Sequence, residues 1–538
     1  MQFGFVIDNR KCIGCHACTV ACKAEHEVPV GVNRTWVKYI EKGIFPQTTR
    51  HFSVMRCNHC ADAPCVEICP VTALYRRPDG IVDFDNRRCI GCKACMQACP
   101  YDALYIDPQN HTAAKCNYCA HRVDLGLEPA CVNVCPEHAI VSGDLQDPAS
   151  EIAQLVAREQ VTVRKGEKGT DPQLFYIDGD AASLDASRTQ AAADYLWSSQ
   201  ESGVGHFARF AEQRKGGRDG SPVGERRQVP PPEASAEEAR RVYDAPDKGV
   251  LWGWEVSGYI WTKALSAGLF LAPFLLSRAA EASAGVWSAC LGAALFFLAL
   301  TGALLVKDLD KPARFAYVLL RPQWRSWLVR GAWIIGAYAI LLTLLLALAL
   351  SQWSWGEAML RPGGAVALLM ILTALAAAAT AAYTAYLLAQ AKGRDLWQSP
   401  LAVLKMFLHA PLAGTAALAL ASPWIPLPQG WIWLLAWMLS ATLLLHLALL
   451  GLELTTPHAT RDASRAAEFI LRGRLAPAFW GGAVVCGGLI PLALLLGHTS
   501  SLFDLFGWAL PLAGLLVLVG LYFSEHAWVR APQWIRLS

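Results

Sequence analysis

The sequence has very little net charge for its length. Its 538 residues include 47 Lys and Arg against 44 Asp and Glu, which gives a formal net charge of +3. A nucleic-acid-binding protein needs a basic surplus to meet the phosphate backbone, so this balance argues against that class. The positions of the charges are more informative than their sum, because long stretches of the second half contain almost none.

These uncharged stretches have the length of membrane-spanning helices. Such a helix needs ~20 apolar residues, and tryptophans lie near several of the stretch ends, as is typical of bilayer interfaces. Buried helices of a large soluble core are the alternative, but eight such runs fit a bilayer better. We predict an all-α membrane domain of eight transmembrane helices. They lie near residues 256–277, 284–306, 328–350, 363–391, 399–421, 430–452, 476–496 and 503–524.

The first residues lack the features of a secretory leader. Met1 to Phe5 run into a β-like segment, with no basic stretch before an apolar core and no twin arginine. Residues 200–250 are rich in Gly, Arg, Glu and Pro, which is typical of a linker or strap. We therefore predict an α+β domain over 1–199, this linker over 200–250, and the membrane domain over 251–538.

Basic residues flank the predicted helices unevenly. The side that carries both termini is basic, whereas the opposite side has only Arg278 and Arg361. By the positive-inside rule, the basic side and the N-terminal domain face the cytoplasm, which predicts the inner (cytoplasmic) membrane. The alternative is that these residues bind partner subunits or anionic lipid. They are Lys307, Lys311, Arg314, Arg321, Arg325, Arg330, Lys392, Arg394, Arg461, Arg465, Arg472, Arg474, Arg530 and Arg536.

Cysteine is concentrated in the N-terminal part of the chain. Of the 18 cysteines, all but Cys290 and Cys486 lie between residues 12 and 135. They form four groups: Cys12-x2-Cys15-x2-Cys18-x3-Cys22, Cys57-x2-Cys60-x4-Cys65-x3-Cys69, Cys89-x2-Cys92-x2-Cys95-x3-Cys99 and Cys116-x2-Cys119-x11-Cys131-x3-Cys135. This spacing predicts ligands for four [4Fe-4S] clusters. Disulfides do not give such repeats, and zinc fits the fourth group alone. A reducing compartment suits metal-bound cysteines.

The groups are expected to share clusters in pairs. In two-cluster ferredoxins, the fourth cysteine of one motif ligates the other motif's cluster. Groups two and three are close in sequence and form one module, which leaves groups one and four for a second, so we predict a double ferredoxin-like α+β domain. The predicted sets are Cys12, Cys15, Cys18 with Cys135; Cys116, Cys119, Cys131 with Cys22; Cys57, Cys60, Cys65 with Cys99; and Cys89, Cys92, Cys95 with Cys69.

With these motifs, residues 1–200 resemble the four-cluster electron-transfer subunit of the complex iron–sulfur molybdoenzymes, the group of dimethyl sulfoxide, polysulfide, tetrathionate and nitrate reductases. No cysteine is replaced by Trp or Asp, so the resemblance implies four cubane clusters and no three-iron centre. Residues 250–538 resemble the NrfD/PsrC-type membrane subunit, through the segments 307–315, 322–327 and 528–533. The two subunits are usually separate proteins in this family and are fused here.

The resemblance implies a partner and a substrate for the membrane part. The partner is a separate catalytic subunit with a molybdenum or tungsten pterin, for which this chain has no readable domain, and the substrate is a quinone (menaquinone or ubiquinone). We expect an electron-transfer and membrane-anchor subunit of a quinone-linked respiratory oxidoreductase. It would have no catalytic centre for the terminal substrate, a sulfur compound such as sulfite, polysulfide or tetrathionate.

Ionisable residues inside the predicted helices indicate where the quinone would bind. Charge in a membrane is costly and usually serves function, and a quinone needs hydrogen bonds to two carbonyl oxygens and a partner for each proton. Alternatively, the lysines extend to the interface and His446 bonds a neighbouring helix. The candidates are His409, Lys263, Asp308, Lys405 and Tyr383.

Two other functions stay open at this point. The same cluster domain could serve a multihaem cytochrome or a nickel–iron hydrogenase in place of a pterin enzyme. A non-redox anchor with degenerate cluster sites is a third alternative, and the complete set of cysteines argues against it.

Overall fold

The computed structural model describes residues 1–44, 47–190, 239–245, 248–354, 364–499 and 508–538. The chain divides into two compact units. The first comprises Met1–Leu251 with Ala391–Gly393 and Arg536–Ser538, and the second Trp252–Gln390 with Arg394–Ile535. The first is α+β and the second is helical, as the sequence predicts. Residues 200–238 of the predicted linker lie outside the described part of the chain.

The first unit contains two four-stranded sheets and two short hairpins. One sheet has the order β8-β1-β10-β9, the other β11-β12-β2-β3, and the hairpins are β4-β5 and β6-β7. In the first sheet β1 runs parallel to β10 and antiparallel to β8. The strands are β1 (Phe3–Asp8), β2 (Thr35–Ile44), β3 (Gln47–Arg56), β4 (Leu74–Arg76), β5 (Val82–Phe84), β6 (Leu104–Ile106), β7 (Ala113–Lys115), β8 (Ile140–Asp144), β9 (Val161–Thr162), β10 (Leu174–Ile177), β11 (Thr189–Gln190) and β12 (Ala239–Tyr243).

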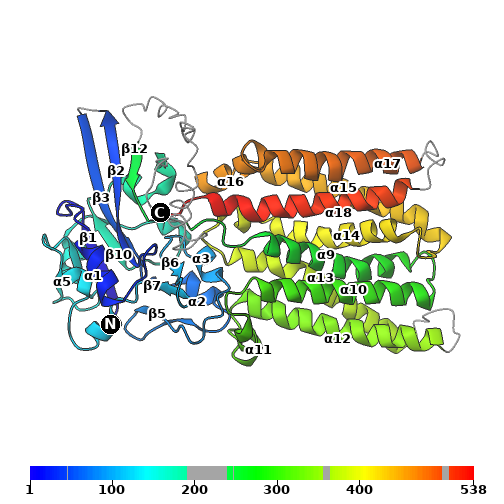
Figure 1. Ribbon diagram of the computed structural model, residues 1–538, viewed down its shortest axis with the longest axis horizontal. Helices are drawn as coiled ribbons and strands as arrows, with labels where there is room; N and C mark the ends of the chain where they lie inside the picture. Colours follow the sequence, from blue (N-terminus) through cyan, green and yellow to red (C-terminus); the bar gives the residue numbers. More distant parts are fainter. Residues whose placement is uncertain (45–46, 191–238, 246–247, 355–363, 500–507) are drawn as a thin grey trace, which may run out of the picture. The chain divides into compact units, whose positions relative to one another are not determined.

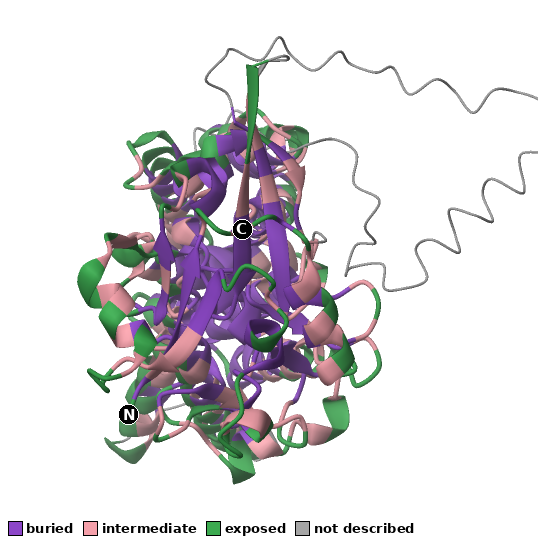
Figure 2. Cartoon of the chain, turned by 90° about the vertical axis from the view of Figure 1, so that its left-hand side faces the viewer, coloured by how far each residue is buried: buried purple, intermediate pink, exposed green. Residues whose placement is uncertain are grey.

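The core of this unit lies between the strands and the cysteine loops. Phe5, Trp36, Met55, Tyr118 and Leu174 are buried in one cluster that also contains Cys18 and Cys131. Figure 2 shows most strand residues of this unit as buried, and β3 becomes exposed only at its first residues. The cysteine loops are therefore held by apolar packing on the sheet side.

Short helices follow the cysteine loops. In the first and third groups, a glycine precedes the second cysteine and has a left-handed backbone, with φ of 72° at Gly14 and 70° at Gly91. A Cβ is disfavoured there, so glycine lets the loop curl tightly. The helices of this unit are α1 (Ala17–Glu25), α2 (Pro64–Ile68), α3 (Ala94–Ala98), α4 (Ala120–Val123), α5 (Ala130–Asn133), α6 (Glu151–Arg158) and α7 (Ala181–Leu184).

Strand β12 lies inside the region predicted as linker. It pairs with β2 in an antiparallel register, so residues 239–243 belong to the first unit. A buried contact next to it holds it in place: Trp36 Nε1 donates a 2.8 Å hydrogen bond to Asp244 Oδ1. The predicted linker therefore includes residues that form a strand. A short strand that follows a Gly- and Pro-rich region has little sequence signal.

The second unit consists of helices that run side by side (Figure 1). Eight helices among the described residues are long and apolar enough to cross a membrane, as predicted. Many large apolar side chains point outwards, such as Phe296, Ile340 and Leu375, which suits a lipid environment. The helices are α9 (Trp254–Leu276), α10 (Ala284–Lys307), α12 (Trp327–Ser354), α13 (Gly364–Ala389), α14 (Ala402–Ala421), α15 (Gln429–Thr455), η5 (Ala478–Leu489) with α17 (Ile490–Thr499), and α18 (Ala509–Arg530).

Three details differ from the sequence prediction. The seventh span begins as a π-helix, η5, before α17 continues it. The last helix continues to Arg530, beyond the predicted end at 524. Glu525 does not end it because this residue is buried against His409 of α14. A predicted basic connection contains the amphipathic helix α16 (Arg461–Leu471), which buries Ala463, Ala466 and Ile470. The short helix α11 (Tyr317–Leu320) follows α10.

Helices α9 and α14 touch through their backbones. A Cβ on Gly268 would overlap the Ala410 carbonyl oxygen and the backbone of Gly414, and a Cβ on Gly414 would overlap the backbone of Gly268. Small residues allow such close approach in membrane helix pairs. A second pair, Gly487 and Gly520, brings η5 against α18 in the same way.

Replacing Gly268 with valine should destabilise the second unit. The side chain would force the α9 and α14 backbones apart, and overpacking costs about 1–3 kcal/mol or more. Thermal unfolding of the chain in mild detergent measures the loss. Gly292→Val in α10 is the matched control, because nothing lies within 4 Å of its Cβ position. Equal unfolding temperatures for the two variants would contradict the close contact.

Candidate functional site

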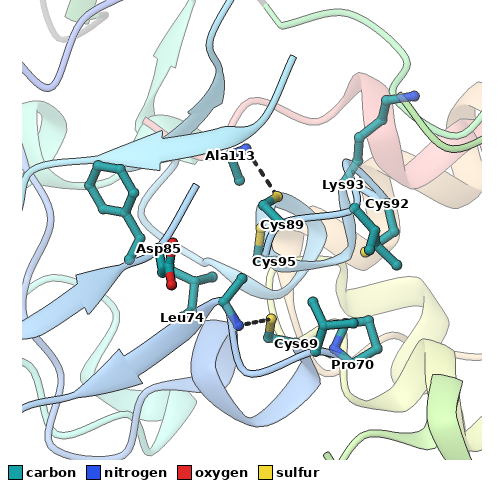
Figure 3. Close-up of a pocket in the computed structure, with 13 residues that line it drawn as sticks. Cys69, Pro70, Leu74, Asp85, Cys89, Cys92, Lys93, Cys95 and Ala113 are labelled. Carbon is teal, nitrogen blue, oxygen red and sulfur yellow. Dashed lines mark hydrogen bonds between the residues drawn. The ribbon is translucent and has the colours of Figure 1, made fainter. Parts of the chain in front are cut away.

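The structure brings four cysteines from the second and third groups around one cavity in the first unit (Figure 3). The cavity has about 390 Å³ of empty space, its open mouth included, and its lining contains Cys69, Cys89, Cys92 and Cys95. Backbone N–H groups point at two of these sulfurs: Ala73 N lies 3.2 Å from Cys69 Sγ, and Ala113 N lies 3.4 Å from Cys89 Sγ. We name these four cysteines the fourth set, because they lie at one end of a row of four such sets.

A second cavity joins the first and last groups. This cavity has about 330 Å³ of empty space, its open mouth included. Its lining contains Cys12, Cys15, Cys18 and Cys135, which we name the first set. Cys15 is exposed, whereas Cys12 and Cys135 are half-buried. Cysteines from opposite ends of the cysteine-rich region therefore meet at one site.

The remaining cysteines lie in two buried groups. Burial is the main cause that raises the pKa of Cys22. Cys116, Cys131 and Cys119 lie close enough for their charges to raise it further. These four are the second set. Burial is also the main cause that raises the pKa of Cys60, and the charges of Cys57, Cys65 and Cys99 raise it further. These form the third set.

The four sets follow one another in a row. Cys18 of the first set lies close enough to Cys131 of the second for the two to interact electrostatically. Cys116 of the second set interacts in the same way with Cys57 of the third. Cys65 of the third set in turn neighbours Cys69 of the fourth. The partly exposed cysteines belong to the two end sets, and those of the second and third sets are buried.

These residues fit iron–sulfur clusters better than single ions. Among the described residues no group of three or more His, Cys, Asp or Glu could hold one metal ion, whereas a cubane binds each cysteine through a different iron and needs a wider ring. Burial raises the pKa of Cys18 and of Cys119 to about 12. Buried thiolates therefore require a nearby positive charge, which bound iron supplies.

The second unit contains a buried cluster of ionisable side chains. Lys405 Nζ lies 2.5 Å from Glu453 Oε2 and 3.8 Å from the centre of the Trp528 ring. One turn along α14, His409 Nδ1 contacts Glu525 Oε1, and its ring centre is 4.9 Å from that of His446. All of these charged groups are almost completely buried. Ion pairing offsets the cost of burying them.

Lys263 on α9 belongs to the same region. Its Nζ donates to Ala381 O at 3.1 Å and to Thr384 Oγ1, and it lies 4.6 Å from the centre of the Tyr383 ring. The charges of Lys263, Lys405 and His409 all act on Glu525. Residues from α9, α13, α14, α15 and α18 therefore converge near the ends of the helices on one side.

The structure unites most of the predicted quinone-site residues. Lys263, Lys405, His409 and Tyr383 lie in this cluster, and neither lysine extends to the interface. Asp308 follows the end of α10 and is a charged neighbour of Tyr259, next to the cluster. His446 packs against His409, and its Nδ1 has no hydrogen-bond partner in the described part of the chain.

The sequence reasoning missed Glu525. The predicted eighth span ended one residue before it, because Glu525 and His526 interrupt the apolar run. A carboxylate placed at helical spacing on a membrane helix, four residues after Leu521 on its buried side, was the available signal. The contact with His409 could not be read from the sequence, because it joins two helices.

Comparison with known families agrees with both units. Two models, each described as a 4Fe-4S dicluster domain, match residues 11–74 and 48–145. The model described as polysulphide reductase, NrfD, matches residues 245–531, which is slightly more than half of the chain. The first unit thus carries iron–sulfur clusters, and the second is a multi-pass membrane domain.

Individual relatives each cover about a third of the sequence. The B subunit of tetrathionate reductase from Salmonella typhimurium is 44% identical over 185 residues, 34% of this chain and 74% of the relative. The B component of polysulfide reductase from Wolinella succinogenes is 39% identical over 190 residues, 34% of this chain and 98% of the relative. Protein NrfC of Escherichia coli is 41% identical over 180 residues, 33% of this chain and 81% of the relative. The chain therefore belongs to the NrfD family of membrane subunits, joined in one polypeptide to an iron–sulfur electron-transfer subunit of the tetrathionate and polysulfide reductase type.

Proposed function

We propose that this chain carries electrons between a separate catalytic subunit and a membrane quinone, through four [4Fe-4S] clusters in the first unit. The observation that carries the proposal is the row of four cysteine sets whose end sets reach the surface. A row of this kind lets electrons enter at one end and leave at the other. When bound, the clusters would supply one-electron redox chemistry.

The buried cluster of the second unit is the proposed quinone site. Oxidation of a quinol releases two electrons and two protons, and reduction of a quinone takes up the same number, so the site needs groups that exchange protons. His409 paired with Glu525 supplies one such group, and His409 Nε2 has no hydrogen-bond partner among the described residues. Lys263 and Tyr383 supply hydrogen-bond donors for the second carbonyl oxygen.

The catalytic partner is proposed to carry a molybdenum or tungsten pterin. The relatives are named as parts of tetrathionate and polysulfide reductases, which supports a sulfur compound as terminal substrate. A multihaem cytochrome or a nickel–iron hydrogenase is the alternative partner, since the same iron–sulfur unit and membrane unit would serve it.

Gentle solubilisation of native membranes should recover this chain with a large companion that contains molybdenum or tungsten. Iron analysis of the anaerobically purified chain should give about sixteen iron atoms, four for each cubane. A companion that contains haem or nickel would show that the partner is a multihaem cytochrome or a nickel–iron hydrogenase and not a pterin enzyme. An iron content well below about sixteen atoms per chain would contradict the four clusters.

The basic side of the membrane unit is proposed to face the cytoplasm of the inner membrane, together with the first unit. Lys and Arg dominate the loops on the side of both chain ends, for example Arg314, Arg465 and Arg474. Protease added to intact cells should therefore leave residues 1–190 uncut, and protease added to inverted vesicles should digest them. The opposite pattern would reverse the orientation.

His409→Gln should slow electron exchange with quinol roughly a hundredfold, the usual scale of a lost acid–base group. The measurement follows reduction of the iron–sulfur absorbance after a short-chain quinol is added to the purified complex, with iron content checked in parallel. Tyr386→Phe, on an exposed part of α13, is the control and should react at the rate of the unaltered chain. An unchanged rate in His409→Gln would remove His409 from the quinone site.

A further inference from the structure

One arginine of the first unit is completely buried beside the cysteines. Arg56, the last residue of β3, has 0% of its surface exposed, and its Nη1 donates a 3.1 Å hydrogen bond to Cys131 Sγ. The guanidinium lies 4.5 Å from the centre of the Phe5 ring. Its Nε and Nη2 groups have no hydrogen-bond partner in the described part of the chain. A buried cation with unused donors is costly unless something negative is close by.

The surroundings of Arg56 show where that negative charge is. Its charged neighbours are Cys131 and Cys116 of the second set and Cys18 of the first. No carboxylate is among them, although arginines elsewhere in this unit pair with acids, as Arg50 does with Glu41. Arg56 therefore stands where the first and second sets meet, and its partners are sulfur ligands.

A second buried cation lies on the other side of the second set. Lys115, also 0% exposed, donates to Cys116 O at 2.8 Å and to Val82 O, and it is a charged neighbour of Cys57 in the third set. Cys116 has both Arg56 and Lys115 as charged neighbours. Two buried positive charges therefore act on the second set, whose four cysteines are all buried.

We propose that Arg56 raises the reduction potential of the cluster held by the second set. This inference rests on the proposed ligand sets. Adding one electron makes a cluster more negative, and a buried cation that donates to a ligand sulfur stabilises that reduced form most where water cannot screen it. No bond forms or breaks in this step. The electron comes from the quinol or the catalytic subunit, and Arg56 keeps its protons.

Arg56 also changes how electrons are distributed along the row of sets. An electron is held more strongly at the second position than it would be without Arg56, so this position favours the reduced state between transfers. Arg56 acts through the sulfurs and touches neither substrate, which distinguishes it from the residues of the quinone site.

The test compares Arg56→Met and Arg56→Lys with Arg50→Gln in the full chain. Arg50 lies on the same strand, is exposed and pairs with Glu41, so its loss should leave all potentials unchanged. Each protein is titrated anaerobically with dithionite and ferricyanide while the cluster signals are followed by electron paramagnetic resonance. Cys119→Ser identifies the signal of the second set. Iron content is measured for every variant.

In Arg56→Met, the potential of the second-set cluster should fall by at least about 59 mV, which is a tenfold lower ratio of reduced to oxidised cluster at a given ambient potential. Arg56→Lys keeps the charge but loses the planar donor fork, so a smaller fall in the same signal is expected. If Arg56→Met loses iron, Arg56→Lys alone decides. Unchanged potentials with full iron content would overturn the inference, whereas a low iron content in the unaltered chain would overturn the ligand sets instead.

Discussion

Both units of this protein depend on the matching of charges that have been removed from water. A buried ion is stable only if an opposite charge or several hydrogen bonds lie next to it. In the first unit the cysteines provide negative charge that bound iron, Arg56 and Lys115 can balance. In the second unit Lys405 meets Glu453 and His409 meets Glu525, inside helices that otherwise expose apolar side chains to lipid.

This requirement links architecture to chemistry. The apolar packing around Phe5 and Trp36 shields Cys18 and Cys131 from water, which increases the influence of each nearby charge on these two cysteines. In the membrane unit the ion pairs lie near one end of the helices, where five helices contribute side chains. Both regions combine low polarity with a few well-placed charges, which is the combination that the proposed electron and proton transfer needs.

Much of this arrangement could be predicted from local sequence signals. The cysteine spacing and the apolar runs are local patterns, so the α+β unit and the eight spans were predicted with modest errors in their ends. The shared-ligand pattern of two-cluster ferredoxins also predicted which distant cysteine groups meet. Other contacts between distant segments could not be predicted, because no motif encodes them. Arg56 precedes Cys57 but lies beside Cys131, and Glu525 follows the last apolar run but meets His409 on another helix. Strand β12 was missed because its partner β2 lies far away in the sequence, which leaves no local signal.

The glycine contact between α9 and α14 also sets the alignment of two proposed site residues. Lys263 precedes Gly268 by five positions, and His409 precedes Gly414 by five positions. As the first and fifth spans, the two helices run in the same direction, so both side chains start at the same height, about 7.5 Å along the axis from the point of contact. The crossing therefore works as a common pivot: a small tilt of one helix about it would change the gap between Lys263 and His409 without altering either residue.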